Sequence, residues 1–292
     1  MTNPSSNFEQ RKQRIVGVFN RAAHLYDQVG PHYFAYFGER LVELACIEPG
    51  RRILDVACGR GAVLFPAAQA VGLEGEVIGI DLAEAMVREA NLAIQSRNLP
   101  YVTVLQMDAE NLLFEPQTFD YVLSGLALLF FPQPGVALAE MWRVLKPGGH
   151  IAISTWDRQG DEIWKWFEED LYHAHMPPRH AAEVETDPLP AQSLELDTPE
   201  GLSHAFHASG FEDISVSAET VDMIYHSKDE WWEALWATSC RLMLEEIEQA
   251  IGADGLERFK KDAFMYLETI QRADGIHQSW PLLFCLAKKP EE

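Results

Sequence analysis

The sequence has no long hydrophobic run. A helix that crosses a membrane needs about 18 or more consecutive apolar residues, and the longest run here, Leu126 to Pro132, is far shorter. The amino-terminal segment, Met1 to Asn7, is polar and lacks the apolar centre of a secretory signal peptide. We therefore expect a cytoplasmic protein without a membrane span.

Cysteines are few and scattered. The four of them, Cys46, Cys58, Cys240 and Cys285, include no C-x-x-C pair, so their spacing fits neither a disulfide framework nor a zinc site. Buried, reduced thiols are the expected state of such residues in the cytosol. We predict no metal site.

Basic residues are also scarce. There are 23 Lys and Arg against 45 Asp and Glu, which gives a formal net charge of -22. Proteins that bind RNA or DNA contact the phosphates through clustered Lys and Arg. This composition argues against nucleic acid as a partner and favours a small molecule.

What the sequence does contain is a regular alternation of strand and helix patterns between Arg52 and Thr155. This order is typical of a parallel sheet with helices on both faces. We expect an α/β fold with a doubly wound, mostly parallel, seven-stranded sheet. The predicted strands are 52–56, 76–80, 102–106, 119–124, 150–155, 211–225 and 279–287.

The chain of 292 residues is long enough for one large domain or for one core with a cap. We divide it into an N-terminal helical cap (1–48), a cofactor-binding core (49–157) and a remainder (158–292). The remainder completes the sheet, and it adds a lid at about 158–197 and a helical insert at about 228–272.

Helical periodicity also marks both ends of the chain. Helices are predicted at 10–25 and 38–45, before the first strand, and at 228–249 and 256–272 within the insert. The three tryptophans of the insert could line a pocket or belong to the core, and we favour the core: Trp231, Trp232 and Trp236.

The segment from Arg52 to Ala62 is a buried strand followed by a tight turn of small residues. Backbone amides at such a turn point outward, and glycine lets a ligand approach the main chain closely. The carboxylate of Asp55 would repel the pyrophosphate of a dinucleotide, and the G-x-G-x-x-G of nicotinamide enzymes is absent. The turn therefore favours a ligand that carries an ammonium group.

Three further polar residues, Asp81, Asp108 and Ser124, lie at or near the ends of predicted strands. Because ligands of such sheets bind at the carboxyl ends of the strands, we expect these side chains near Asp55. Asp81 follows the glycine turn by about 20 residues, a distance at which an acidic residue accepts hydrogen bonds from ribose hydroxyls.

Five segments in this region carry a family likeness. The chain resembles class I S-adenosylmethionine-dependent methyltransferases, particularly the small-molecule enzymes of ubiquinone and menaquinone biosynthesis. One matching segment alone is weak support, whereas five in the family's order, between about Arg51 and Ser154, are specific. The segments are Leu54-Asp-Val-Ala-Cys-Gly-Arg-Gly61, Val77-Ile-Gly-Ile-Asp81, Met107-Asp-Ala-Glu-Asn-Leu112, Phe119-Asp-Tyr-Val-Leu-Ser124 and Arg143-Val-Leu-Lys-Pro-Gly-Gly149.

The resemblance implies a Rossmann-like fold, with S-adenosyl-L-methionine as cofactor and S-adenosyl-L-homocysteine as product. Asp55 and the loop backbone would hold the amino-acid end, Asp81 the ribose and Asp108 the adenine amine. The sequence departs from the family pattern at Ala57, where many members have glycine. The predicted cofactor-binding residues are Tyr26, Tyr33, Asp55, Ala57, Gly59, Gly61, Asp81, Leu82, Met86, Met107, Asp108, Ala109, Ser124 and Gly125.

The aromatic-rich segment from Tyr26 to Phe37 has two interpretations. It is either a lid that excludes water from the cofactor or a stripe of helical core. We place Tyr26 and Tyr33 at the cofactor, and we name Phe37 and Trp156 as candidates for the acceptor pocket.

The reaction that the resemblance implies is methyl transfer, by in-line displacement, to a small apolar or aromatic metabolite, as in secondary metabolism. The methylated atom (oxygen, carbon or nitrogen) stays open, and so does the choice between monomer and homodimer. The alternatives are a protein or tRNA acceptor, or a catalytically silent binding module with the same fold.

An oxygen acceptor often needs a general base, and histidine is the usual one. The candidates are His32 in the amino-terminal cap and His173, His175 and His180 in the predicted lid. Each is more commonly a surface or structural residue. His173 and His175 do not suit a joint metal site, because residues two apart on a helix point to different faces.

Overall fold

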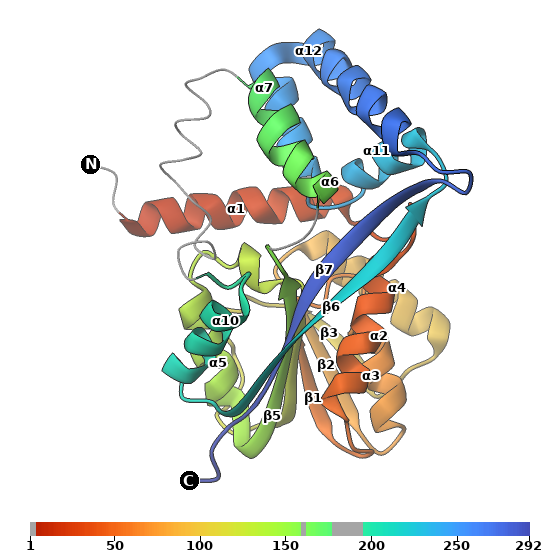
Figure 1. Ribbon diagram of the computed structural model, residues 1–292. Coiled ribbons are helices and arrows are strands. Elements are labelled where there is room, and N and C mark those ends of the chain that lie inside the picture. The colour runs from red at the N-terminus through yellow and green to blue at the C-terminus, as the bar shows by residue number, and fades with distance from the viewer. Residues whose placement is uncertain (1–3, 159–161, 177–194) are drawn as a thin grey trace.

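A computed structural model describes residues 4–158, 162–176 and 195–292. Its centre is one seven-stranded sheet in the order β3-β2-β1-β4-β5-β7-β6 (Figure 1). The first five strands run parallel, and β7 pairs antiparallel with both β5 and β6. The predicted seven-stranded, mostly parallel sheet is confirmed. The strands are β1 Arg52–Val56, β2 Glu76–Asp81, β3 Val102–Gln106, β4 Phe119–Gly125, β5 Leu145–Trp156, β6 Glu212–Tyr225 and β7 Ile276–Lys288.

Helices cover both faces of the sheet, which is why the inner strands are almost continuously apolar. On one face α2 (Tyr33–Ala45) packs over β4, β5 and β7, α3 (Leu64–Val71) over β1 and β2, and α4 (Glu84–Arg97) over β2 and β3. On the other face α5 (Pro134–Val144) packs over β5, and α10 (Pro199–Ala208) packs over β6 and β7. The β1 residues from Ile53 to Val56 are accordingly buried.

A separate group of helices lies beyond the carboxyl ends of the parallel strands (Figure 1). From here on the word cap means this group, and not the N-terminal segment 1–48. Strands β6 and β7 extend out of the sheet to carry the cap. The cap has its own hydrophobic cluster, which contains Phe167, Trp231 and Phe259. Its elements are α6 (Glu162–Lys165), the π-helix η2 (Trp166–Tyr172), α7 (His173–His175), α11 (Lys228–Trp236) and α12 (Arg241–Ile270).

The helices of the insert differ from the prediction. The continuous helix predicted at 228–249 is wrong, because the chain leaves the helix after Trp236 and starts α12 at Arg241. Within α12, Gly252 takes a left-handed backbone conformation (φ 73°), which only glycine adopts readily, and this kinks the helix. Trp231 and Trp232 are buried in the cap cluster, with Trp236 packed against it, as predicted.

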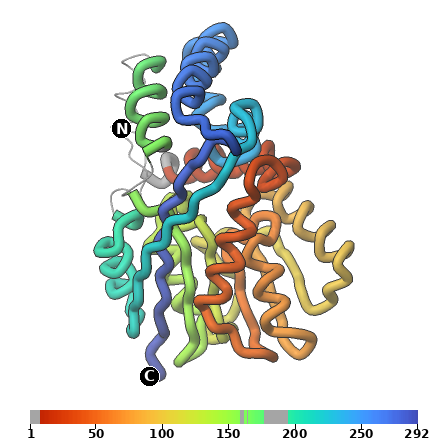
Figure 2. The backbone as a smooth tube through the Cα atoms, turned by 45° about the vertical axis from the view of Figure 1, so that its right-hand side comes forward, coloured from red at the N-terminus to blue at the C-terminus, as the bar shows by residue number. Residues whose placement is uncertain are grey.

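Helix α1 (Pro4–Ala22) crosses between the core and the cap, as the two backbone views show (Figures 1 and 2). It contacts α4 on the core side and α12 on the cap side. Arg14 and Arg21 form ion pairs with Glu246 and Glu245 of α12. The helix therefore ties the two parts of the molecule together.

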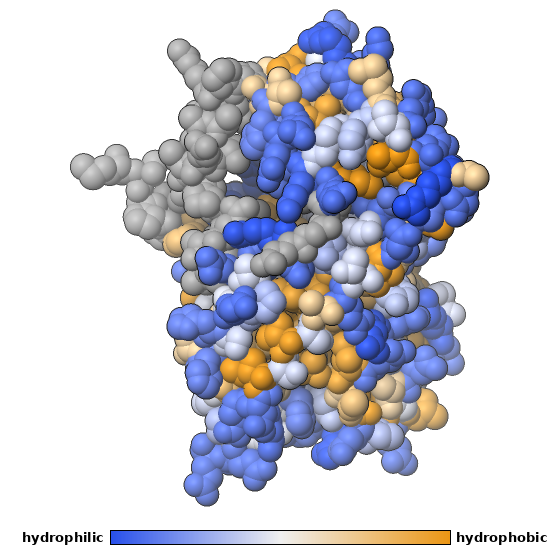
Figure 3. All heavy atoms as spheres, in the orientation of Figure 1, coloured by the Kyte–Doolittle hydropathy of each residue, from blue (hydrophilic) through white to orange (hydrophobic). Residues whose placement is uncertain are grey.

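The face that carries β6 and β7 is shown in Figure 3. Hydrophilic side chains dominate the cap and the foot of the core, and apolar side chains gather where the two strands cross the middle. Among the helices of the described ranges, none combines the length and apolar character that a membrane crossing requires.

Gly38 of α2 allows the closest approach between a helix and the glycine turn. A Cβ atom at this position would lie 2.1 Å from the carbonyl oxygen of Ala62, which is backbone and cannot rotate away. We expect Gly38→Ala to lower the free energy of unfolding by about 1–3 kcal/mol, measured by denaturant unfolding. Gly135→Ala is the matched control, because a Cβ there meets nothing within 4 Å. A Gly38→Ala protein as stable as that control would contradict this packing.

Candidate active site

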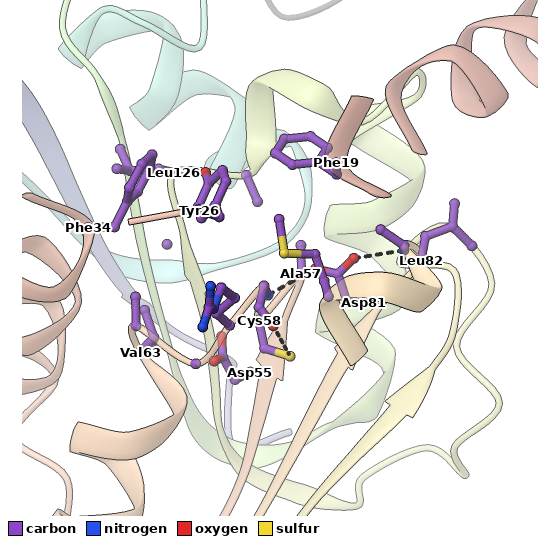
Figure 4. Close-up of a pocket in the computed structure, with 18 of the residues that line it drawn as sticks. Phe19, Tyr26, Phe34, Asp55, Ala57, Cys58, Val63, Asp81, Leu82 and Leu126 are labelled. Carbon is purple, nitrogen blue, oxygen red and sulfur yellow. Dashed lines mark hydrogen bonds between the residues drawn. The ribbon is translucent and has the colours of Figure 1, made fainter. Parts of the chain in front are cut away.

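A cavity of about 460 Å³ opens at the carboxyl ends of β1, β2 and β4. This volume lies within the range of small-molecule sites, roughly 300–1,000 Å³. Two carboxylates, Asp55 and Asp81, lie on its floor (Figure 4). Aromatic rings lie opposite them, from Phe19, Tyr26 and Phe34. The cavity thus has an acidic side and an aromatic side.

The turn after β1 has an unusual backbone, with positive φ at Ala57 (57°), Gly59 (53°) and Gly61 (99°). The value at Ala57 explains why glycine is common at this position, since the left-handed region costs about 1–2 kcal/mol for other residues. At Gly59, by contrast, a Cβ would meet nothing within 4 Å. The turn therefore presents open backbone to the cavity.

Asp55 is fully buried, and neither of its carboxylate oxygens has a hydrogen-bond partner among the described residues. Burial, and then the nearby charge of Asp81, raise the pKa of Asp55 well above its usual range; the nearby Leu64 amide, which does not reach normal hydrogen-bond geometry, opposes them only in part. A buried carboxylate in this state lacks a cation or donor. The ammonium group of an amino acid would supply both.

Asp81 is held by the backbone around it. Its Oδ2 accepts a hydrogen bond from the Gly59 amide at 2.9 Å, and its Oδ1 accepts one from the Ala83 amide at 2.8 Å. Burial nevertheless raises the pKa of Asp81 to about 6. Each oxygen keeps a second lone pair, so the carboxylate can still accept from two hydroxyl groups.

Asp108 already has a cationic partner. The Lys12 ammonium of α1 lies 2.6 Å from Asp108 Oδ2 and 2.7 Å from Glu110 Oε2. The other Asp108 oxygen accepts a hydrogen bond from the Glu110 amide. Helix α1 is therefore anchored directly beside the third predicted carboxylate.

A second contact ties the glycine turn to the end of α1. Arg60 donates hydrogen bonds to the carbonyl oxygens of Ala23 and His24, at 3.0 and 2.7 Å. Tyr26 follows the anchored residue His24 by two positions, so this contact also helps to place the Tyr26 ring on the aromatic side of the cavity. The Tyr26 ring lies 4.7 Å from that of Phe34 and 5.9 Å from that of Phe19.

Twelve of the fourteen predicted cofactor-binding residues line this one cavity. They are Tyr26, Asp55, Ala57, Gly59, Gly61, Asp81, Leu82, Met86, Met107, Asp108, Ala109 and Gly125.

The remaining two, Tyr33 and Ser124, lie outside the cavity. The Ser124 hydroxyl donates to the Val56 carbonyl oxygen at 2.9 Å and so joins the ends of β4 and β1. Tyr33 is buried against Trp280, with ring centroids 4.7 Å apart, because α2 turns Phe34 rather than Tyr33 toward the cavity. The two acceptor-pocket candidates, Phe37 and Trp156, pack edge-to-face on each other outside this cavity.

The three described histidine candidates also lie elsewhere. His32 is exposed, with its Nδ1 2.6 Å from the Asp27 carbonyl oxygen. His173 is exposed on the cap, and His175 pairs with Asp262 at 2.9 Å. His180 lies outside the described residues. Within the described ranges, no group of three His, Cys, Asp or Glu is arranged to hold a metal ion.

Several cavity residues were not predicted. Lys12, Asp27 and Leu126 line the site from three different segments. Asp27 caps α2, because its carboxylate accepts the amides of Phe34 and Ala35 at 3.4 and 3.1 Å. The one sequence signal that could have identified Asp27 is its position seven residues before Phe34, within the aromatic-rich segment. Nothing in the sequence around Lys12 indicates its partner.

The strand order and this cavity define a doubly wound α/β protein whose ligand lies at the carboxyl ends of the strands, where the strand order reverses. A family model described as a methyltransferase domain matches residues 53–149. The chain is also similar to the YcgJ protein from Bacillus subtilis, at a TM-score of 0.57 and 17% identity over 88% of this chain and 99% of that one.

Similarity to characterised proteins extends further. Nocamycin O-methyltransferase from Saccharothrix syringae is 32% identical over 79% of this chain and 84% of that protein. Aklanonic acid methyltransferase DauC from Streptomyces sp. (strain C5) is 38% identical over 49% of this chain and 66% of that protein. A demethylmenaquinone methyltransferase from Bacillus cereus is 31% identical over 49% of this chain and 62% of that protein. The chain thus spans less than two thirds of the last two relatives.

The chain belongs to the class I S-adenosylmethionine-dependent methyltransferases, and S-adenosylmethionine is its cofactor. The unpaired Asp55 carboxylate and the open backbone at Gly59 fit the amino-acid end of that cofactor, which carries one ammonium and one carboxylate.

The burial of Asp55 predicts a pH-dependent stability. Because the pKa of folded Asp55 lies above 3.8, the folded chain keeps a proton that the unfolded chain has lost. The free energy of unfolding therefore falls as the pH rises above that value, and Asp55→Asn removes this loss. Between about pH 5 and pH 8 we expect the Tm of cofactor-free Asp55→Asn to rise relative to wild type.

Asp120→Asn serves as the control for this experiment. Burial alone would raise the pKa of Asp120, but Lys146 and the Arg52 amide outweigh it and lower the pKa below 3.8. Both its folded and unfolded pKa values thus lie below the tested range, and the variant should show no such trend. Parallel Tm profiles for Asp55→Asn and wild type would contradict the assignment.

Proposed function

We propose that this protein transfers a methyl group from S-adenosylmethionine to an oxygen atom of a small apolar or aromatic metabolite. The observation that carries the proposal is the buried Asp55 carboxylate, which has no hydrogen-bond partner among the described residues and lines the cavity beside the glycine turn.

In this proposal Asp55 pairs with the cofactor ammonium, and the open backbone at Gly59 leaves room for the cofactor carboxylate beside the turn. Asp81 accepts hydrogen bonds from the ribose hydroxyls. The adenine lies toward Asp108, where its amine would share the carboxylate with Lys12. Apolar side chains that line the same part of the cavity pack on the ring: Leu82, Met86 and Met107.

Similarity to enzymes named for their products or acceptors supports oxygen as the methylated atom. One relative, which matches 79% of this chain, is named as an O-methyltransferase, and another is named for the methylation of aklanonic acid. The net charge of -22 supports a small molecule over a nucleic acid.

The cofactor supplies a methyl carbon that is already activated by the sulfonium. The protein's share of the reaction is therefore positioning and the exclusion of water. Phe19, Tyr26 and Phe34 would keep water from the reacting groups on the side opposite the aspartates. Asp27 would fix Phe34 in this position through the two amides that it caps.

Cofactor binding should depend on the protonation of Asp81. Because the pKa of free Asp81 is about 6, the group is a full acceptor only above that pH. We expect the affinity for S-adenosylhomocysteine, measured by calorimetry, to fall below about pH 6 by at most tenfold per pH unit.

In Asp81→Asn the affinity should be lower at pH 8 and should fall less steeply below pH 6 than in the wild type, because only the contribution of Asp55 remains, while Asp120→Asn should follow the wild type. An affinity in the wild type that does not change between pH 5 and pH 7 would refute the ribose role of Asp81.

Methyl transfer can be tested with radiolabelled S-adenosylmethionine and a set of defined acceptors. We expect label in 2-naphthol or 1-hydroxy-2-naphthoic acid, less in 2-naphthylamine and none in bulk tRNA. Asp55→Asn should reduce the affinity for the cofactor by about 10- to 100-fold, because it removes a charged hydrogen bond. Label in tRNA alone, or cofactor binding without any turnover, would favour one of the other two functions.

A further inference from the structure

A second, much smaller cavity lies between the core and the cap. Its volume is about 10 Å³, room for no more than about one water molecule. Tyr33 and Trp280 line it from the core, and Phe167, Trp231 and Leu235 line it from the cap. It is therefore a seam between two hydrophobic clusters, and ligand sites are common at such boundaries.

Only the first turn of α2 separates this seam from the cofactor cavity. Phe34 lines the larger cavity, and its neighbour Tyr33 lines the smaller one, with their rings 4.4 Å apart. A molecule in the seam would thus approach the cofactor from the aromatic side, opposite Asp55 and Asp81. This is the side from which an acceptor must come if the aspartates hold the donor.

The walls of the seam suit a flat ring. Tyr33 and Trp280 are stacked, with an angle of 25° between their planes, and Trp156 lies 5.0 Å from Trp280. An aromatic ligand could replace one of these ring contacts with another of the same kind, at little cost in buried surface.

One polar group of the seam lacks a partner. Trp280 is 8% exposed, yet its indole Nε1–H has no hydrogen-bond acceptor among the described residues. Trp231, across the seam, does have one, since its Nε1 donates to Gln278 Oε1 at 3.2 Å. Gln278 and Trp280 lie two residues apart on β7 and therefore on the same face of the strand. A buried donor without an acceptor is unfavourable, and a ligand oxygen would supply the missing acceptor.

We propose that this seam opens to hold the acceptor and that the Trp280 indole N–H donates a hydrogen bond to an oxygen of a flat aromatic acceptor. The inference rests on the proposed function, because it assumes that the larger cavity holds the methyl donor. Opening requires the cap to move relative to the core, which their separate hydrophobic clusters permit. Trp280 is then a specificity-determining residue rather than a general base.

The test uses two probes of equal shape, 2-acetylnaphthalene and 2-isopropenylnaphthalene, which differ only by a carbonyl oxygen in place of a methylene group. Each is titrated into the full chain saturated with S-adenosylhomocysteine, and the eight tryptophan indole signals are followed by ¹⁵N NMR. The signal missing from the spectrum of Trp280→Phe identifies Trp280.

We expect the acetyl probe to bind about 5- to 10-fold more tightly and to shift the Trp280 indole proton, which the isopropenyl probe should not do. In Trp280→Phe the two affinities should become equal, with the affinity for S-adenosylhomocysteine unchanged. Trp142→Phe is the control, because it removes an indole N–H that donates to Gly210 on another face of the molecule.

Equal binding of the two probes to wild type, or no binding of either, would overturn the inference. The wild-type comparison stands even where Trp280→Phe does not fold. Failure of the proposed function is seen separately, because the radiolabel assay would then show no methyl transfer to any small aromatic acceptor, whatever the two probes do.

Discussion

The arrangement of the site depends on a carboxylate that the fold buries without a partner. Asp55 lies on an inner strand of the sheet, β1, between β2 and β4, where burial disfavours its charge. A folded chain keeps such a group only where something else requires it. The features around it follow from the same requirement: the turn strained at Ala57, the hydroxyl of Ser124 on the end of β1, and the open space beside the backbone at Gly59.

Helix α1 closes this site by charge rather than by apolar packing alone. Lys12 binds the acidic group at Asp108 and Glu110, and Arg14 and Arg21 bind two glutamates of α12. The same helix therefore contacts the cofactor cavity and the cap. The chain is strongly acidic, with a net charge of -22. These three cations therefore reduce the repulsion among the acidic side chains that they pair with. The helix thus couples the position of the cap to the Asp108 end of the cavity.

Most of the predicted cofactor-binding residues line one cavity because the sequence features that place them are local. Asp55, Asp81 and Asp108 each end or follow a strand, so strand periodicity and parallel topology together bring them to one edge. The error at Tyr33 has a definite cause. His32 adopts a left-handed conformation (φ 51°), and α2 starts at the next residue, Tyr33. This is five residues before the start of the predicted helix at Gly38. That shift turns Phe34 toward the cavity, and no sequence signal marks a non-glycine residue at positive φ.

The proposed acceptor site, the seam between core and cap, could not be predicted from the sequence, for a different physical reason. The family model covers residues 53–149 as one continuous block, whereas the seam is built from α2, α11 and β7, which lie far apart in the chain. Contacts between such segments depend on how the cap packs on the core, and periodicity carries no information about that. A conserved donor needs one arrangement of backbone and charge, but each acceptor needs a different surface. The sequence therefore indicates the residues that would bind the methyl donor. The proposed acceptor site depends instead on how the cap packs against the core.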